Sequence, residues 1–251
     1  MATSTEAAVP IERDARVLQA LSEGELKLEG RLVEASNASF LGTVRLDPFG
    51  APEIRCIYKP IAGERPLWDF PDGTLAHREV AAYVVSEAAG WGVVPATVFR
   101  PEGPFGAGMA QEWIDVDETY DLVSALRVGT PALRCIALFD AVVNNTDRKG
   151  GHLLPTRDGR LLGVDHGVCF SVEPKLRTIL WGWRGVRLRA AEVATLGRLR
   201  DGLEGPLADS LAPHLHADEV AATRDRLVAL MAKRRFPQPN PDWPAVPWPP
   251  F

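Results

Sequence analysis

Residues 139–170 constrain this chain more than any other stretch, because polar residue types interrupt an apolar sequence there in a defined order. An apolar run ends in an Asn-Asn-Thr-Asp cluster, which terminates regular structure and places Asp147 in a loop. Two short apolar strands are expected at 152–155 and 161–164, joined by a segment with Asp-Gly at its centre, which is typical of a β-hairpin. The hairpin returns the chain to its starting point and presents Asp165. The pattern therefore predicts two carboxylates at the mouth of one small β-unit.

The residue types in this stretch are those of a metal-dependent phosphoryl-transfer site. Two loop carboxylates with a neutral ligand, His152, between them in sequence suit a hard divalent cation that takes substrate phosphates as further ligands. In such chemistry one Asp orients the acceptor hydroxyl, and another Asp after a strand binds the metal. We therefore predict that Asp147 is catalytic and that His152 and Asp165 hold the metal. Asp140, still on the preceding helix, is expected to hydrogen-bond the loop, and the alternative for the whole stretch is an ordinary hairpin with solvated carboxylates.

The same residues resemble a known family. The chain reads N-T-D-R-K-G-G-H at 145–152 and V-D-H-G at 164–167. Type II phosphatidylinositol 4-kinases carry a similar N-T-D-R-G-x-x-N loop and a later I-D-N-G. The chain thus resembles the phosphatidylinositol 3/4-kinase and HipA-like branch of the protein-kinase-like superfamily. It departs from the pattern at His152, where the family has a metal-binding Asn, and imidazole favours softer ions than magnesium.

The resemblance implies an α+β, two-lobed kinase-like fold, with a β-rich N-lobe and a mainly helical C-lobe. Lys59 lies on a strand expected at 54–60, and the resemblance gives it the role of the cation that grips the α- and β-phosphates. Glu79 lies on a helix that opens near Thr74, and the resemblance makes it the partner that fixes Lys59. An exposed lysine at a strand end and a solvent-facing glutamate are the alternatives.

Two further segments are candidates for nucleotide contacts. A short loop of small polar residues joins the first two expected strands, and it could turn backbone N–H groups and hydroxyls toward phosphate oxygens. Its candidate residues are Ser36, Asn37 and Ser39. By resemblance, the adenine would meet the backbone of the strand end that precedes the second lobe, at Gln111, Glu112, Trp113 and Ile114.

The composition shifts to acidic residues directly after residue 114, which marks the expected hinge between the lobes. We expect an N-terminal extension with a helix, an N-lobe, a C-lobe and a proline-rich tail, at residues 1–24, 25–114, 115–235 and 236–251. The tail carries seven prolines, so it should be extended. It could dock on a partner protein, or it could lie along the chain's own surface. The segment 171–189 combines basic residues with Trp181 and Trp183, which favours an anionic or membrane-interface substrate. A packed loop with solvated arginines is the alternative.

Composition excludes several other classes of function. A hydrophobic content of 46% and a charged content of 24% in 251 residues are those of a globular protein. The formal net charge of −5 argues against nucleic-acid binding, which needs a basic footprint. No apolar run approaches the roughly 20 residues of a membrane span, and no signal pattern opens the chain, so we expect a cytoplasmic protein. Cys56, Cys135 and Cys169 are widely spaced and are expected to be reduced structural thiols.

The predicted function is phosphoryl transfer that depends on ATP and on Mg²⁺ or Mn²⁺, with a hydroxyl of a lipid, a small molecule or a protein as the acceptor. One rival is a pseudokinase that binds nucleotide and serves as a scaffold, which the His152 departure keeps open. A second rival has the same fold but transfers the AMP group of ATP.

Overall fold

The computed structural model describes residues 10–32, 37–46 and 53–251, and its contacts divide the chain into two compact units. Unit 1 consists of Met1–Arg65 and Ala96–Trp113, and unit 2 consists of Pro66–Pro95 and Ile114–Phe251.

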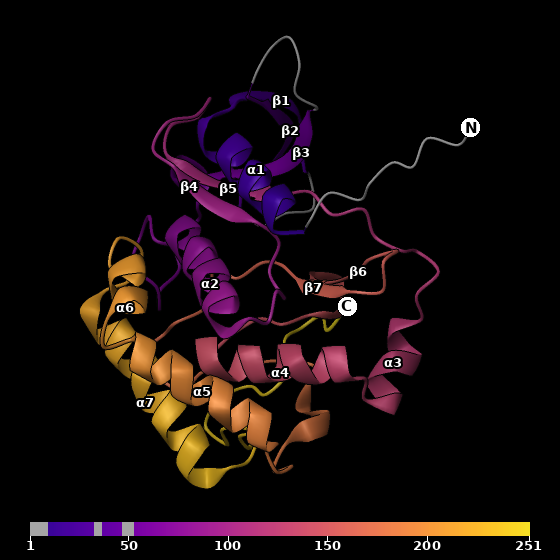
Figure 1. The fold of residues 1–251 in the computed structure, drawn as a ribbon, viewed down its shortest axis with the longest axis vertical. Coiled ribbons are helices and arrows are strands. Elements are labelled where there is room, and N and C mark those ends of the chain that lie inside the picture. The colour runs from indigo at the N-terminus through magenta and orange to yellow at the C-terminus, as the bar shows by residue number, and fades with distance from the viewer. Residues whose placement is uncertain (1–9, 33–36, 47–52) are drawn as a thin grey trace. The chain divides into compact units, whose positions relative to one another are not determined.

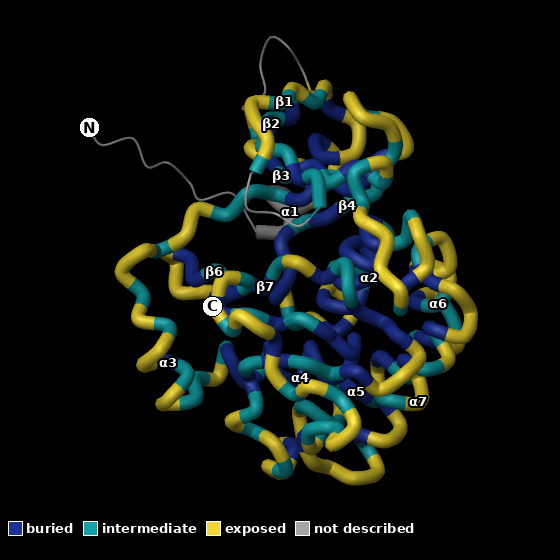
Figure 2. Tube along the Cα trace, turned by 180° about the vertical axis from the view of Figure 1, so that it is seen from behind, coloured by how far each residue is buried: buried dark blue, intermediate teal, exposed yellow. Residues whose placement is uncertain are grey.

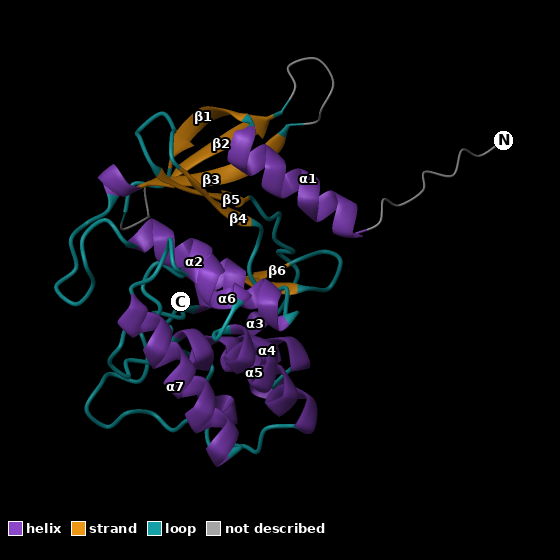
Figure 3. Cartoon of the chain, turned by 60° about the vertical axis from the view of Figure 1, so that its left-hand side comes forward, coloured by secondary structure: helices purple, strands orange, loops and turns teal. Residues whose placement is uncertain are grey.

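Unit 1 is built on an antiparallel sheet, which has five strands within the described residues, in the order β1-β2-β3-β5-β4. The strands are β1 (Glu25–Arg31), β2 (Phe40–Arg45), β3 (Ile54–Pro60), β4 (Thr97–Arg100) and β5 (Gly108–Glu112). Side chains alternate between the faces of a strand, and β3 buries Cys56 and Tyr58 in this way. Helix α1 (Pro10–Glu23) packs on the sheet, with Val17 and Leu21 buried against it (Figure 3).

Unit 2 is mainly helical, and its elements are labelled in Figure 1. The helices are α2 (Leu75–Ala89), α3 (Leu122–Val128), α4 (Pro131–Val143), α5 (Ala190–Gly202), α6 (Pro206–Leu211) and α7 (Ala217–Lys233). A two-stranded hairpin, β6 (Leu153–Pro155) and β7 (Leu161–Gly163), follows α4. Figure 2 shows buried residues gathered along α2 and α4, which contribute many residues to the main core of the unit.

Helix α4 is the central support of unit 2, and its ends are well defined by sequence. Thr130 caps the N-terminus by accepting a hydrogen bond from Leu133 N at 3.4 Å, and Pro131 occupies the first turn, where a missing N–H costs nothing. Asn144 ends the helix in the left-handed conformation, which Asn tolerates better than most residues. The end of the helix is therefore fixed, and so is the starting position of the loop at residues 145–152.

Helix α2 is held in unit 2 by a buried arginine. Arg78 is 1% exposed, donates to the Cys169 carbonyl at 2.8 Å and forms an ion pair with Glu219 of α7. Its guanidinium also lies over the ring of Phe70, 4.8 Å from the centroid. A buried charge is tolerated only when it is paired and hydrogen-bonded, so these contacts fix α2 against α7.

The expected α+β class, with one β-rich and one mainly helical part, is confirmed. The contacts divide the chain differently from the expected boundaries, because α1 packs on the sheet of unit 1 and α2 packs on helices of unit 2. Strand β4 begins only at Thr97, and Val93 lies outside the sheet, where its carbonyl accepts a bond from Gly163 N of β7 at 2.7 Å.

Two expectations about composition can also be compared with the structure. Among the described residues, no helix alone is long and apolar enough to cross a bilayer. Helices α3 and α4 reach that length and apolar content only when they are taken together, and the pair is bent by 81°. The three cysteines are free, as expected. Burial raises the pKa of the Cys56 and Cys135 thiols to about 11, so both stay protonated at neutral pH.

Candidate active site

The loop that follows α4 folds on its own side chains, and this positions Asp147. The Asn145 side-chain oxygen accepts a bond from Asp147 N at 2.9 Å, a local turn typical of Asn. Thr146 Oγ1 donates to the Val168 carbonyl at 2.8 Å, which ties the loop to the segment after β7. Both neighbours are buried, whereas the Asp147 carboxylate is 25% exposed. The loop thus holds one partly exposed carboxylate on a buried base.

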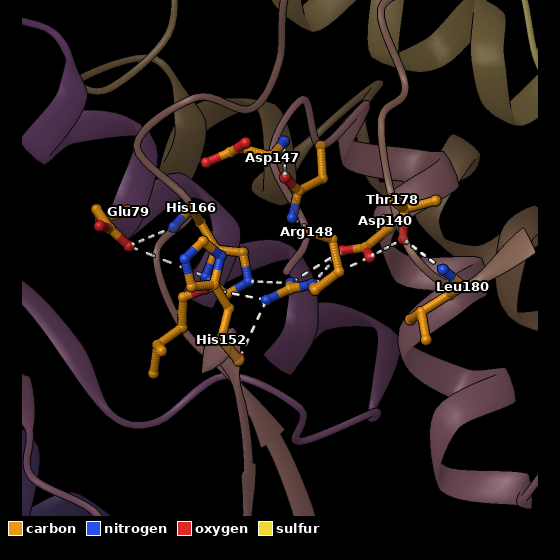
Figure 4. A network of polar contacts seen from close by, with 10 residues as sticks. Glu79, Asp140, Asp147, Arg148, His152, His166, Thr178 and Leu180 are labelled. Carbon is orange, nitrogen blue, oxygen red and sulfur yellow. Dashed lines mark hydrogen bonds and ion pairs between the residues drawn. The ribbon is translucent and has the colours of Figure 1, made fainter. Parts of the chain in front are cut away.

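Arg148, the next residue, is fully buried and connects the parts of the site (Figure 4). Its Nε and Nη2 donate to both carboxylate oxygens of Asp140 on α4, at 2.9 to 3.2 Å. Its Nη1 donates to the carbonyls of Val164 at 2.9 Å and His152 at 3.3 Å. Burial alone lowers the pKa of Arg148, but the Asp140 carboxylate more than offsets that effect. One guanidinium therefore joins α4, the loop and the hairpin.

Asp140 hydrogen-bonds the loop, as expected from the sequence. Besides Arg148, it accepts a bond from the side-chain amide of Asn145 at 3.0 Å and one from Thr178 Oγ1 at 3.5 Å. Asp140 is fully buried. Its role is to set the backbone around Asp147 through Arg148 and Asn145.

His166 links the same guanidinium to Glu79 on α2. Arg148 Nη2 lies 2.7 Å from His166 Nε2, and an arginine can only donate, so His166 Nε2 accepts and its proton lies on Nδ1. The backbone N–H of His166 donates to Glu79 Oε2 at 2.8 Å. Glu79 is 2% exposed. Helix α2 is therefore fixed directly to the residue that follows Asp165.

His152 and Asp165, the two predicted metal ligands, lie next to each other. His152 Nε2 is 3.4 Å from Asp165 Oδ2, and the Asp165 side chain is 50% exposed. Val164 N donates to the His152 carbonyl at 3.0 Å, so the hairpin brings the two residues together. Asp165 itself adopts a left-handed backbone conformation (φ 59°), a local strain of the kind found at functional sites.

This pair fits a divalent cation. Burial lowers the pKa of His152, although Asp165 opposes the effect, so the imidazole is neutral at pH 7 and can ligate. Its Nδ1 is buried and has no hydrogen-bond partner among the described residues. One imidazole and one carboxylate favour a first-row transition ion over Mg²⁺, and Mn²⁺ is the member of that series most like Mg²⁺ in its preference for oxygen ligands. The described part of the chain contains no group of three or more His, Cys, Asp or Glu side chains that could hold a metal ion, so the candidate site consists of this pair.

Two cations that the sequence reasoning did not assign contact Asp147. Lys149 Nζ lies 3.1 Å from Asp147 Oδ2, and Arg177 Nη2 lies 3.1 Å from Asp147 Oδ1. Arg177 also donates to the Thr146 carbonyl at 2.7 Å. Lys149 could have been found from its place two residues after Asp147. Arg177 is thirty residues away and gave no local signal.

The basic segment after β7 does not present all its charges to solvent. Lys175 is 4% exposed and lies 3.2 Å from Asp69, with its ammonium over the ring of Trp68. Together with Arg177 it is used inside unit 2. The expectation of an anionic acceptor therefore rests on fewer exposed charges than the sequence indicated.

The predicted phosphate-binding residues belong to unit 1. Lys59 is on β3, opposite Met109 of β5. Asn37 accepts a bond from Arg65 N at 2.9 Å, and Ser39 is buried with its hydroxyl 3.5 Å from the Asn37 carbonyl. Asn37 and Ser39 thus contribute to the loop itself, and Ser36 lies outside the described residues.

The predicted adenine-binding stretch has several groups in use within the sheet. The Gln111 side chain donates to Thr97 Oγ1 at 2.8 Å. The N–H groups of Glu112 and Trp113 donate to the carbonyls of Ala96 and Arg55, at 2.8 and 2.9 Å. The backbone donors of Glu112 and Trp113 are therefore already used within unit 1.

Comparison with known proteins gives one relative in sequence and several in structure. No protein-family model matches the chain. Protein Rv2133c of Mycobacterium tuberculosis is 41% identical over 266 residues, which cover 92% of this chain and 94% of that protein.

Two solved structures that are similar to this chain are a kinase by name and the hydra protein Fam20. A Golgi casein kinase with Mn and ADP bound has a TM-score of 0.61 at 16% identity, covering 90% of this chain and 76% of that one. The hydra protein Fam20, solved with sugar, has a TM-score of 0.57 at 13% identity, covering 90% of this chain and 89% of that one. The chain therefore has a kinase-like fold.

Proposed function

The chain belongs to the family of Mycobacterium tuberculosis protein Rv2133c, and we propose that it is a metal-dependent phosphotransferase that uses ATP. The observation that carries the proposal is the pairing of His152 with Asp165 on the hairpin that follows the Asp147 loop. The kinase-like fold of the chain, and the Mn and ADP bound by the similar Golgi casein kinase, support the choice of nucleotide and metal.

His152 Nε2 and an Asp165 oxygen would hold the cation. When bound, a divalent cation neutralises charge on the phosphate oxygens of the nucleotide. The Asp165 side chain is half-exposed and can also contact water or substrate. The His152 side chain is largely buried, and its backbone carbonyl accepts a bond from Val164 N of the hairpin. Lys59 would bind the α- and β-phosphates.

Asp147 would accept the proton of the acceptor hydroxyl. As this O–H bond breaks, the acceptor oxygen bonds to the γ-phosphorus, and the bond between that phosphorus and the β–γ bridging oxygen breaks to release ADP. Lys149 and Arg177 already lie against the Asp147 carboxylate, so positive charge is available where the transferring group develops negative charge. The fixed backbone supplied by Asp140 and Arg148 means that little reorganisation is required.

The finer resemblance, to phosphatidylinositol 3/4-kinases and HipA-like proteins, also belongs to this proposal. It is supported by the N-T-D-R sequence at 145–148. The acceptor is an alcohol of a lipid, a small molecule or a protein.

The test measures turnover of ATP by the purified protein with Mg²⁺ and with Mn²⁺. We expect Asp147→Asn to lower turnover on the order of 10²- to 10⁴-fold, the usual effect of losing a positioned base. Asp165→Asn should weaken metal binding, so that turnover is lower and needs a higher concentration of Mg²⁺ or Mn²⁺. Asp201→Asn removes an exposed carboxylate of α5, 66% exposed, and serves as the matched control that should behave as the wild type.

Mass analysis of the product separates the rivals. Transfer of a phosphoryl group supports the proposal, whereas transfer of AMP would establish the nucleotidyl-transferase alternative. Nucleotide binding without turnover under either metal would contradict the proposal and support the pseudokinase scaffold.

A further inference from the structure

The C-terminal segment 236–251 lies along unit 2, and its composition explains how. Proline has no N–H group, so a segment with seven prolines in sixteen residues pairs with its surroundings mainly as an acceptor. Proline also restricts its own backbone and that of the preceding residue to extended conformations, so less chain entropy is lost on docking. The tail is thus suited to accept hydrogen bonds from buried N–H groups of the rest of unit 2.

The first contacts of the tail are with the segment after β7. Phe236 is buried, and its N–H and carbonyl pair with the backbone of Val186 and Gly185, at 3.0 and 3.2 Å. The Ala245 carbonyl accepts two bonds, from Thr178 N at 3.0 Å and from Trp181 Nε1 at 2.7 Å. These two donors stand on the segment that also carries Arg177.

That segment is in turn paired with the catalytic loop. Arg148 N donates to the Arg177 carbonyl at 3.0 Å, and Ile179 N donates to the Arg148 carbonyl at 3.2 Å. Thr178 therefore stands between the tail on one side and Arg148 on the other. The tail is thus connected to Arg148, the residue next to Asp147, through the backbone pairing of residues 177–179 with Arg148.

The end of the tail contacts the catalytic loop directly. The Pro250 carbonyl accepts a bond from Gly150 N at 2.8 Å, three residues after Asp147, and the end of the chain is drawn beside the β6–β7 hairpin in Figure 1. A Cβ added at Gly150 would overlap the Phe251 ring, and the atoms nearest to it all belong to that ring. Gly150 is buried, whereas Phe251 is 62% exposed.

We propose that residues 243–251, here called the brace, hold the catalytic loop in the position that places Asp147 for the reaction. The contact between Phe251 and Gly150 is the part of the brace that acts on the loop directly. The inference rests on the proposed function, because the brace acts on the loop that carries Asp147. The tail contacts the loop at Gly150, whereas Asp140 contacts it at Asn145 and Arg148, so the loop is held on both sides of Asp147 in the sequence. The tail is on this account part of the catalytic unit and not a docking ligand for another protein.

The test is a double-mutant cycle between Gly150 and Phe251. Gly150→Ala should displace the ring and lower kcat for ATP turnover on the order of 10-fold, with the KM for ATP unchanged, because loop placement and not nucleotide binding is altered. Phe251→Ala should lower kcat to a similar extent. The double variant should be no slower than Phe251→Ala, since the added methyl then meets no ring. Gly151→Ala is the matched control, because a Cβ there meets nothing within 4 Å.

Amide hydrogen exchange gives a readout that does not depend on activity. In Phe251→Ala and in Gly150→Ala, exchange at Gly150 N should become faster, while exchange in α7 should stay the same. A protein without ATP turnover that still shows this change would contradict the proposed function but keep the docked tail. Unchanged kcat in all three variants, or a higher kcat in Phe251→Ala, would overturn the brace, and a higher kcat would identify the tail as inhibitory.

Discussion

Arg148 combines full burial with hydrogen bonds to α4, the loop and the hairpin, and no other described side chain of the site does so. Its charge is compensated by Asp140, which is also fully buried. The attraction between such charges is strong, but so is the cost of removing them from water. What the pair provides is a fixed geometry for the residue before it, Asp147.

Removing one member of this pair should be costly. We expect Asp140→Ala to lower the free energy of unfolding by about 3–5 kcal/mol, because Arg148 is left buried and uncompensated. Urea unfolding followed by circular dichroism measures the change. The double variant Asp140→Leu with Arg148→Met should recover much of the loss, since an apolar pair needs no compensation. If the double variant is less stable than Asp140→Ala, the buried pair is not the source of the effect.

His152 should set the metal preference. Replacing it by the amide that the resembling family carries, His152→Asn, supplies an oxygen ligand, which suits Mg²⁺ better than imidazole does. We expect the ratio of turnover with Mg²⁺ to turnover with Mn²⁺ to rise in this variant. An unchanged ratio would mean that His152 does not touch the cation.

The residue types of the site could be predicted from the sequence, but most of their partners could not. Asp147, His152 and Asp165 fall at fixed places around turn residues, so local rules find them. Arg177 reaches Asp147 from thirty positions away, and only the folding of the segment after β7 brings it there. For the same reason the sequence did not show that Lys175, one of the basic residues of 171–189, is buried.

Among the elements, the β6–β7 hairpin is shaped by the buried guanidinium beneath it. Gly163 of β7 lies against Arg148, and a Cβ at this position would come within 3.0 Å of Nη2 and 3.1 Å of Nη1. The strand needs a glycine here because Arg148 cannot move away from Asp140 without leaving both charges unpaired.

Gly163→Ala should therefore destabilise unit 2 by about 1–3 kcal/mol, the usual cost of inserting a methyl group into a packed interior. It should also lower kcat, because Arg148 is pushed from the Val164 carbonyl. Thermal unfolding and ATP turnover measure the two effects. Gly151→Ala, an open position on the same loop, is the control. A Gly163→Ala variant with wild-type stability would contradict this packing.

Elements were predicted best where sequence signals were local. Helix α4 ends at Val143, directly before the Asn-Asn-Thr-Asp cluster that was predicted to terminate it. The bounds of β3 match the expected strand. The attachment of α2 to unit 2 could not be predicted, since it depends on Arg78 meeting Glu219 of α7.

At the scale of the whole molecule, stability should depend on pH through a pair of histidines. His77 on α2 and His214 before α7 have Nδ1 atoms 3.1 Å apart. Burial, and then the charge of His77, lowers the pKa of His214 to about 4, and burial also lowers the pKa of His77. Unfolded histidines bind protons at about pH 6.5, so the unfolded state takes up protons first as the pH falls.

The stability contributed by this pair is present above about pH 6.5 and is lost as the pH falls toward 4. His152, whose pKa burial also lowers, acts in the same direction. We expect the free energy of unfolding, from urea titrations, to decrease over this range and the decrease to be smaller in His214→Gln. His77→Gln should reduce it less than His214→Gln does. An identical decrease in all three proteins would assign acid sensitivity to other groups.

The central claim is that His152 and Asp165 are the protein ligands of a metal–nucleotide site, and electron spin-echo measurements on Mn²⁺ with ADP test it most directly. Coordination by His152 predicts a nitrogen coupling to Mn²⁺ in the wild-type protein, lost in His152→Asn and retained in the control His216→Gln. Asp165→Asn should weaken Mn²⁺ binding without removing the nitrogen coupling. Binding of Mn²⁺ and ADP with no nitrogen coupling, or with a coupling that survives His152→Asn, would contradict the account.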